Sequence, residues 1–237
     1  MTWIKICGTT NLEDALAAAE AGADALGFVF APSPRRISPR DAGRIIAALP
    51  APVEKIGVFV NQSVELVLDT VHRSGLTGVQ LHGEEDGRFA RRLCEKYGSG
   101  QLRVIKVVSM REVGQGTGKG LAIAAQVDAV KMFSALLLDS GGNSKRGGTG
   151  ATFDWQEAAP MVRLLAKRIA LIVAGGLNPD NVAKALRSFH PWGVDVVSGV
   201  ERAPGKKDTG KLRAFIAAVR QFEGEPLRPP EKAATRQ

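Results

Sequence analysis

The sequence alternates between short runs of β-branched and apolar residues and longer segments in which apolar residues recur at helical spacing. Eight runs have the length and composition of buried strands: 3–7, 24–30, 54–60, 77–82, 102–108, 134–139, 169–174 and 193–198. Six of the segments between them have an amphipathic helical pattern: 11–23, 38–50, 63–75, 85–98, 153–167 and 178–189. This alternation predicts a parallel sheet whose strands are joined by helices.

Residues typical of helix ends flank these segments. The expected N-caps are Asn11, Ser38 and Ser63, and the glycines expected at helix C-termini are Gly22, Gly75 and Gly98. Asn178 followed by a proline predicts a further helix start. The glycine-rich stretch 114–120 makes the fifth helix the weakest of the series.

Eight strand–helix units in about 220 residues fit a closed (β/α)8 TIM barrel of the α/β class, and we expect one domain over residues 1–223. The alternative is an open, doubly wound sheet that binds a dinucleotide. That fold needs a GxGxxG turn after the first strand, where this chain has CGTTN at 7–11. We therefore predict the barrel. Residues 224–237 are rich in proline and charge, which predicts a disordered tail.

Composition narrows the class of protein. No run approaches 18 apolar residues, and the N-terminus lacks a basic segment followed by an apolar one, so neither a membrane span nor a secretion signal is expected. Two cysteines and three histidines without ligand spacing predict a cytoplasmic protein that binds no metal.

The net charge of +8 raises the possibility of nucleic-acid binding. However, residues 202–237 hold nine Lys and Arg against four Asp and Glu, which is +5 of that +8, and they form a last helix and the tail. Aromatic residues make up only 5% of the chain, so no stacking platform accompanies the basic residues. An anionic small-molecule substrate accounts for the charge equally well, and we expect no nucleic-acid partner.

In a TIM barrel the active site lies at the C-terminal ends of the strands, which directs attention to the residues found there. Gly175-Gly176 follows the seventh strand, and Ser198-Gly199-Val200 follows the eighth. Tandem glycines let backbone N–H groups approach an anion, and these two loops are the recurrent phosphate site of the fold. Tight turns alone are the alternative reading of one such loop, but the pair predicts a phosphate site.

Strand alternation groups Cys7 with Lys5 on the inner face of the first strand, with Ile4 and Ile6 facing the helices. A lysine one layer below the cysteine is expected to favour the thiolate, which is the reactive form. The alternative is that Cys7 is a small buried hydrophobic residue. Asp195 has the inward parity too, so it is expected to need a partner such as Lys5.

Two further sets of polar residues fall at strand ends. Asp139 closes the apolar run SALLLD, where packing explains a carboxylate poorly, although a turn residue is the alternative. Arg35-Arg36 lies in the loop after the second strand, and one guanidinium there is suited to hold a carboxylate by two hydrogen bonds. A solvated charge pair is the alternative for the arginines.

Several segments together resemble the phosphoribosylanthranilate isomerase family of tryptophan biosynthesis. The resemblance covers Lys5 to about Phe222 and rests on KICGTTNLEDALAAAEAGADALGFVFAPSPRRISP, GVQLHGEE, LLLD, AGGLNPDNV, DVVSGVE and PGKKD. It implies a TIM-barrel isomerase that performs an Amadori rearrangement of N-(5′-phosphoribosyl)anthranilate without a cofactor or a metal. The segment 109–133 is hard to align, and Val197 stands where the family commonly has serine.

The resemblance also implies roles for individual residues. Cys7 would be the general base, Asp139 the general acid, and Arg36 the group that holds the anthranilate carboxylate. The phosphate would be held by backbone amides at Gly175, Gly176, Ser198, Gly199 and Val200. Supporting roles are expected for Lys5, Gln80, His82 and Asp195.

Three other functions are alternatives to this isomerase. A sibling sugar-phosphate isomerase of histidine biosynthesis would carry aspartate in place of Cys7, and indole-glycerol-phosphate synthase would need a catalytic lysine at a strand end. A non-catalytic basic binding module would show nucleic-acid affinity that falls with salt. Both a monomer and a homodimer fit the sequence.

Overall fold

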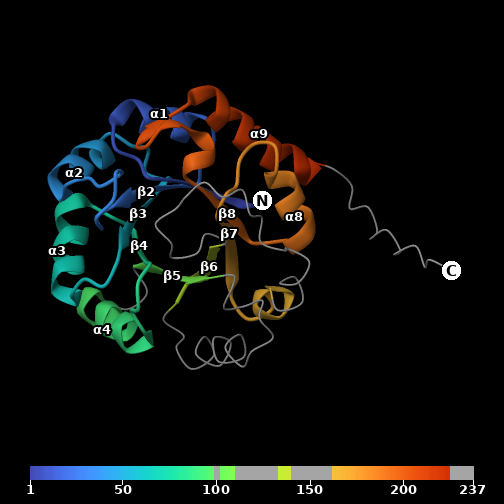
Figure 1. The fold of residues 1–237 in the computed structure, drawn as a ribbon. Helices are drawn as coiled ribbons and strands as arrows, with labels where there is room; N and C mark the ends of the chain where they lie inside the picture. The colour runs from blue at the N-terminus through green and yellow to red at the C-terminus, as the bar shows by residue number, and fades with distance from the viewer. Residues whose placement is uncertain (99–101, 110–132, 140–161, 225–237) are drawn as a thin grey trace.

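A computed structural model describes residues 1–98, 102–109, 133–139 and 162–224 of the chain (Figure 1). Eight parallel strands form a closed barrel in the order β1 to β8, which confirms the predicted fold class. The strands are β1 (Trp3–Cys7), β2 (Ala25–Val29), β3 (Glu54–Phe59), β4 (Gly78–Leu81), β5 (Arg103–Ser109), β6 (Ala135–Asp139), β7 (Ala170–Ala174) and β8 (Gly193–Val196). Each lies within two residues of the run that predicted it.

Helices surround the barrel and cover its strands (Figure 1). They are α1 (Leu12–Glu20), α2 (Pro39–Ala47), α3 (Val64–Ser74), α4 (Gly87–Tyr97), α8 (Val182–Phe189) and α9 (Thr209–Gly224). After β8 come a 3-10 turn, η1 (Ser198–Val200), and a hairpin of β9 (Glu201–Ala203) and β10 (Lys206–Lys207). The predicted caps Asn11, Ser38 and Ser63 each accept a hydrogen bond from a backbone N–H in the first turn of their helix.

The start of α8 differs from the prediction. It begins at Val182 rather than directly after Asn178. The side chain of Asn178 accepts hydrogen bonds from the N–H groups of Asp180 and Asn181, and the side chain of Asn181 accepts one from the N–H of Asn178. These reciprocal bonds hold residues 178–181 in a turn, so the helix starts only after it.

Three expectations fall on parts of the chain that are not described. The weak fifth helix near 114–120 lies outside the described residues. Of the segment 153–167, only residues from 162 onward are described, and 162–166 are helical. Of the predicted tail, Gly224 ends α9, and residues 225–237 lie outside the described residues.

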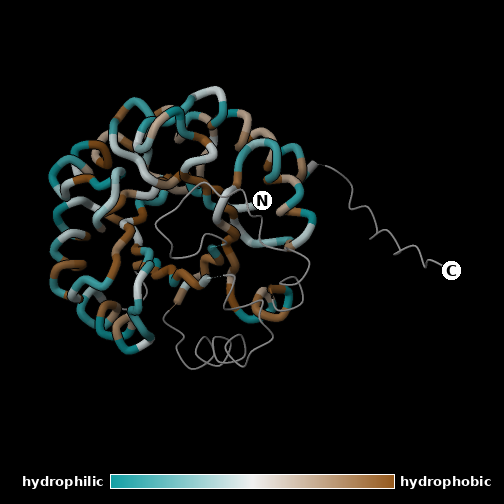
Figure 2. Tube along the Cα trace, in the orientation of Figure 1, coloured by the Kyte–Doolittle hydropathy of each residue, from teal (hydrophilic) through white to brown (hydrophobic). Residues whose placement is uncertain are grey.

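The barrel strands are largely hydrophobic (brown in Figure 2), and the alternation of their side chains gives two hydrophobic layers. Ile4, Ile6 and their counterparts on the other strands pack outward against the helices in one cluster. The inward positions form a second, smaller cluster inside the barrel, built from Trp3, Ala25, Ile56, Ile105, Ala135, Leu137, Ile172 and Ala174. The predicted parity of β1 is therefore confirmed.

The pairing of β1 with β8 closes the barrel and brings two charges together inside it. In this register Lys5 lies opposite Asp195. The ammonium Nζ of Lys5 donates a hydrogen bond to Asp195 Oδ1 over 2.8 Å, and the two side chains are 0% and 5% exposed. This ion pair confirms the prediction that the inward-facing Asp195 has Lys5 as its partner.

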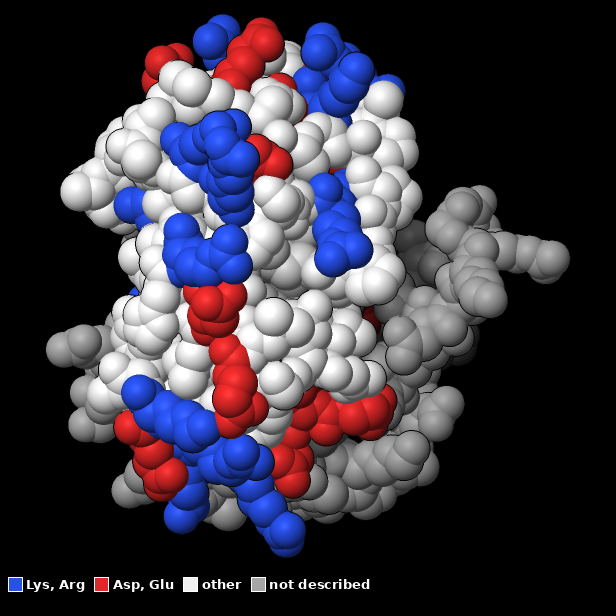
Figure 3. Space-filling model, turned by 90° about the vertical axis from the view of Figure 1, so that its left-hand side faces the viewer, with Lys and Arg blue, Asp and Glu red and all other residues white. Residues whose placement is uncertain are grey.

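The outer surface carries both signs of charge. On the face formed by α2, α3 and α4, blue and red side chains are interleaved (Figure 3), with ion pairs Arg44–Asp41, Arg73–Asp69 and Lys96–Glu65. Within the described parts of the chain, no helix is long and apolar enough to cross a membrane.

The buried Lys5–Asp195 pair gives a prediction about stability. Asp195→Ala leaves the Lys5 ammonium without its carboxylate and is expected to cost about 3–5 kcal/mol in the free energy of unfolding. The double variant Lys5→Met/Asp195→Ala removes both charges and is expected to lose clearly less than the sum of the two single variants. Denaturant titration measures all four proteins, and strictly additive losses would contradict the coupling.

Candidate active site

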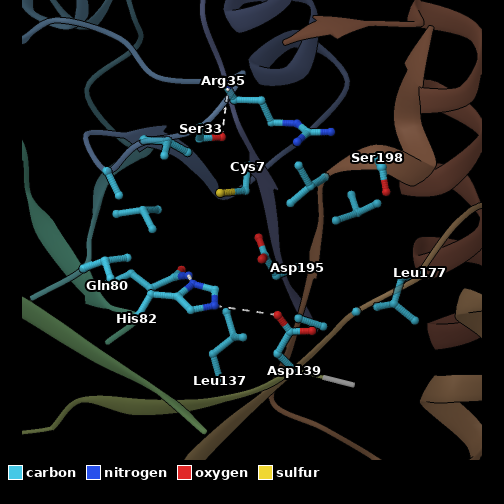
Figure 4. Close-up of a pocket in the computed structure, with 18 of the residues that line it drawn as sticks. Cys7, Ser33, Arg35, Gln80, His82, Leu137, Asp139, Leu177, Asp195 and Ser198 are labelled. Atoms are coloured by element: carbon cyan, nitrogen blue, oxygen red, sulfur yellow. Dashed lines mark hydrogen bonds and ion pairs between the residues drawn. The ribbon is translucent and has the colours of Figure 1, made fainter. Parts of the chain in front are cut away.

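A cavity of about 340 Å³ opens at the C-terminal ends of the strands (Figure 4). Side chains from several strands reach it: Cys7 from β1, Gln80 from β4, Asp139 from β6 and Asp195 from β8, with His82 from the residue after β4. The structure thus brings these five sequence-predicted residues to one site. In the described part of the chain, no three His, Cys, Asp or Glu side chains lie close enough together to hold a metal ion.

Cys7 ends β1 with its side chain directed into the barrel. It lies opposite Gly27 of β2, where a Cβ atom would come within 2.5 Å of the Cys7 sulfur. Gly27 therefore leaves the space that the sulfur occupies. After Cys7 the chain turns at Gly8, whose positive φ of 76° suits glycine.

The pKa of Cys7 reflects two opposing effects, burial and nearby charges. Burial raises the pKa of the thiol, while the nearby positive charges of Lys5 and Lys207 lower it and Asp195 raises it. The net shift is upward because burial outweighs the lysine charges, although Lys5 acts on the thiol in the predicted direction and favours the thiolate. The sequence revealed the lysine but not the desolvation, which depends on how completely the barrel encloses the sulfur.

Gln80, His82 and Asp139 form a row along another side of the cavity (Figure 4). Gln80 Nε2 lies 3.3 Å from His82 Nδ1, and His82 Nε2 lies 3.8 Å from Asp139 Oδ2. Burial lowers the pKa of His82 below its ordinary value, and this effect outweighs the opposing effect of the Asp139 charge. The imidazole is consequently neutral at pH 7.

The two glycine-containing loops meet at the cavity mouth. Gly175 and Gly176 both have left-handed φ angles, 86° and 66°, and both line the cavity together with Ser198. A Cβ atom at Gly199 would lie 1.9 Å from the carbonyl oxygen of Leu177, so only glycine allows the loop after β8 to approach the loop after β7 this closely.

The five residues predicted for phosphate binding do not all line the main cavity. Gly199 borders a second, shallower hollow that Ser198 also lines, and the Val200 side chain is buried. Val197, the departure from the family pattern, has the inward parity of Asp195 and lines the main cavity.

The two adjacent arginines have different surroundings. Arg35 is among the residues that line the cavity, and its guanidinium donates to both carboxylate oxygens of Glu201, with the shortest contact 2.6 Å from Nη2 to Oε2. Arg36 is exposed and is not among the residues that line the cavity. Its backbone N–H donates to Ser33 O, and its backbone pairs with Val29.

Sequence reasoning missed Glu201 and Lys207, which support the site from the hairpin of β9 and β10. The buried carboxylate of Glu201 contacts Arg35, the N–H of Gly205, and Lys207 Nζ at 3.2 Å. Lys207 Nζ also donates to the carbonyl oxygen of Cys7 over 2.5 Å. The motif SGVE with PGKKD contains both residues, but only the folded hairpin shows that they reach β1.

The two arginines provide a matched test of this arrangement. Arg35→Met removes the bidentate partner of the buried Glu201 and is expected to cost about 1.5–3 kcal/mol of unfolding free energy. Arg36→Met at the exposed neighbour is expected to change it by no more than about 0.5 kcal/mol. Thermal or denaturant unfolding measures both, and equal losses would contradict the structural role given to Arg35.

Comparison with known proteins agrees with this geometry. The family model described as "PRAI: N-(5'phosphoribosyl)anthranilate (PRA) isomerase" matches residues 4–218. The N-(5'-phosphoribosyl)anthranilate isomerase of Pelobacter propionicus is 43% identical over 231 residues, which is 96% of this chain and 100% of the relative. That of Citrifermentans bemidjiense is 45% identical over 224 residues, 94% of this chain and 98% of the relative.

Solved structures show the same likeness. The crystal structure of phosphoribosyl anthranilate isomerase from Thermotoga maritima is 42% identical, covers 93% of this chain and 100% of its own, and superposes with a TM-score of 0.78. Another phosphoribosyl anthranilate isomerase structure, in complex with reduced 1-(o-carboxyphenylamino)-1-deoxyribulose 5-phosphate, is 41% identical with a TM-score of 0.75, and covers 93% of this chain and 100% of its own. With the family model matched over nearly the whole barrel, the chain belongs to the N-(5′-phosphoribosyl)anthranilate isomerase family.

Proposed function

We propose that this chain converts N-(5′-phosphoribosyl)anthranilate into 1-(2-carboxyphenylamino)-1-deoxyribulose 5-phosphate, with Cys7 as general base and Asp139 as general acid. The observation that carries the proposal is that one cavity at the C-terminal end of the barrel holds both groups, on different strands. The family membership supports the choice of substrate and reaction.

The reaction needs one acid and one base. Asp139 gives its proton to the ring oxygen of the ribose as the bond between that oxygen and C1′ breaks, and the amine nitrogen supplies the electron pair that forms a Schiff base. Cys7 then removes the proton from C2′, which gives an enolamine. The enolamine then gains a proton at C1′ while its C2′ hydroxyl loses one, which leaves the ketone at C2′. Two protons are gained and two are lost in all, so the product is an isomer of the substrate.

The reactive state requires a thiolate at Cys7 and a protonated carboxyl at Asp139. It holds the same number of protons as a thiol paired with a carboxylate, so binding need only redistribute one proton between the two groups. Burial raises the pKa of Cys7, which disfavours the thiolate. The positive charge of the Schiff base that forms near the sulfur favours it at the step where it is needed.

We assign each end of the substrate to polar groups that lie at the cavity or beside it. We assign the phosphate to backbone N–H groups of the loops after β7 and β8, at Gly175, Gly176, Ser198, Gly199 and Val200. The paired left-handed glycines support this assignment, since successive N–H groups in such a turn form an anion-binding concavity. We assign the anthranilate carboxylate to Arg36, because Glu201 already occupies the Arg35 guanidinium.

Removing either proton-transfer group tests the proposal. Cys7→Ala and Asp139→Asn are each expected to lower kcat by about 10²–10⁴-fold with the fold retained, because each deletes one of the two catalytic groups. Steady-state assays that follow anthranilate fluorescence, with substrate made in situ, measure the loss. Cys94→Ala and Asp69→Asn, which lie on α4 and α3, are the matched controls. Full activity in either site variant would overturn the assignment.

The assignment of Arg36 has its own test. Arg36→Met is expected to raise KM about tenfold or more with kcat little changed, because a charged bidentate contact to the substrate is lost. The exposed Arg40, four residues away on α2, supplies the control Arg40→Met. An unchanged KM in Arg36→Met would refute the assignment.

A further inference from the structure

Gln80 and His82 share the inward face of one strand. Along β4, Val79 and Leu81 point outward and are fully buried under the helices, so the residues that alternate with them point into the barrel. The backbone N–H of His82 donates to Phe59 O and extends the strand by one residue. Gln80 and His82 therefore reach the cavity from adjacent inward positions (Figure 4).

Gln80 is poorly explained as a stabilising residue. It is 2% exposed, and its Oε1 is the one buried side-chain nitrogen or oxygen in the described part of the chain that has no hydrogen-bond partner. Such a group costs about 1–3 kcal/mol, whereas an apolar side chain of similar size would fill the position without that cost. The contact made by its amide nitrogen is then the feature that requires a glutamine.

That contact is with His82 Nδ1, 3.3 Å from Gln80 Nε2. An amide N–H can only donate, so Nδ1 must accept with its lone pair, and the single proton of the neutral ring lies on Nε2. The ring is neutral because burial lowers the pKa of His82, against the opposing charges of Asp139 and Asp195 and with the help of Lys5 and Lys106. The protonated nitrogen is the one that lies 3.8 Å from Asp139 Oδ2 (Figure 4).

We propose that Gln80 is a positioning residue that holds His82 as the Nε2–H tautomer, so that an N–H group rather than a lone pair faces the carboxyl of Asp139. This inference rests on the proposed role of Asp139 as the general acid.

The tautomer decides what His82 does for proton transfer. An N–H directed at Oδ2 favours a proton on the other oxygen, Oδ1, and stabilises the carboxylate that remains when Asp139 has given this proton to the ring oxygen of the substrate. With the other tautomer, a lone pair would face the carboxyl and compete with the substrate for the same proton. The 3.8 Å separation is longer than a hydrogen bond, and catalytic contacts of this kind commonly tighten when substrate binds.

The tautomer can be read directly in the protein without substrate. Long-range ¹H–¹⁵N correlation spectra of the uniformly ¹⁵N-labelled chain distinguish the two neutral tautomers, and the signals that disappear in His82→Asn assign the ring. The wild type is expected to show the Nε2–H form. Gln80→Met removes the donor and should give a mixture of tautomers. Gln80→Glu places an acceptor beside Nδ1 and should shift the ring toward the Nδ1–H form.

Kinetics then test what the tautomer contributes. Gln80→Met and Gln80→Glu are expected to lower kcat about tenfold or more with KM within about twofold, because a histidine in the wrong tautomer weakens its proton-transfer partner. The melting temperature of Gln80→Met should not fall, since the substitution also removes the unpaired oxygen. Gln62→Met, at a glutamine outside the cavity lining, is the matched control and should leave kcat unchanged.

Three results would overturn the inference: an Nδ1–H tautomer in the wild type, a tautomer that neither Gln80 variant changes, or a changed tautomer with unchanged kcat. A wild-type chain that fails to isomerise phosphoribosylanthranilate would instead refute the proposed function. The spectra would still report which tautomer Gln80 selects, so the two failures are distinguishable.

Discussion

The buried ion pair between Lys5 and Asp195 is the constraint on which the rest of the site depends. Each charge would be costly inside the barrel alone, so the two strands that carry them must meet in one register. That register joins β1 to β8 and closes the barrel. It also fixes the parity of β1, because a slip of one residue would turn Cys7 toward the helices and bring Ile6 inside. The same strand register therefore closes the barrel and places the Cys7 sulfur inside it.

Enclosure has opposite consequences for the ionisable groups around the cavity. It raises the pKa of Cys7 and lowers the pKa of His82, so both groups are neutral near pH 7. The charges that remain are held by partners, as Glu201 is by Arg35 and Lys207. A site of this kind responds strongly to the charge that a bound substrate brings, because the effective dielectric constant around buried groups is lower than in bulk water. Proton transfer within the proposed isomerase thus depends on what the substrate itself supplies.

Strand periodicity was sufficient to predict the barrel, its eight strands and the inward position of Cys7, because each apolar run is short and its alternation is regular. The sequence also predicted one site at the C-terminal ends of the strands for Asp139, Asp195, Gln80 and His82. It did not reveal the hydrogen-bonded turn at 178–181 that delays α8, nor which of the two arginines Glu201 engages. Both depend on contacts between side chains and distant backbone, which leave no periodic pattern. The direction in which Lys5 shifts the pKa of Cys7 could be predicted too, but the larger effect of burial could not, because the extent of burial is not visible in a sequence.

Titration of Cys7 tests most directly whether the buried pair controls the chemistry of the site. The rate of alkylation by iodoacetamide, followed against pH in a Cys94→Ala background, reports the pKa of the remaining thiol. The account predicts a pKa above the ordinary value of a cysteine, and a still higher one when Lys5→Met is added, because burial raises it and the lysine charge lowers it. A folded Lys5→Met protein whose Cys7 pKa is unchanged or lower would contradict the account.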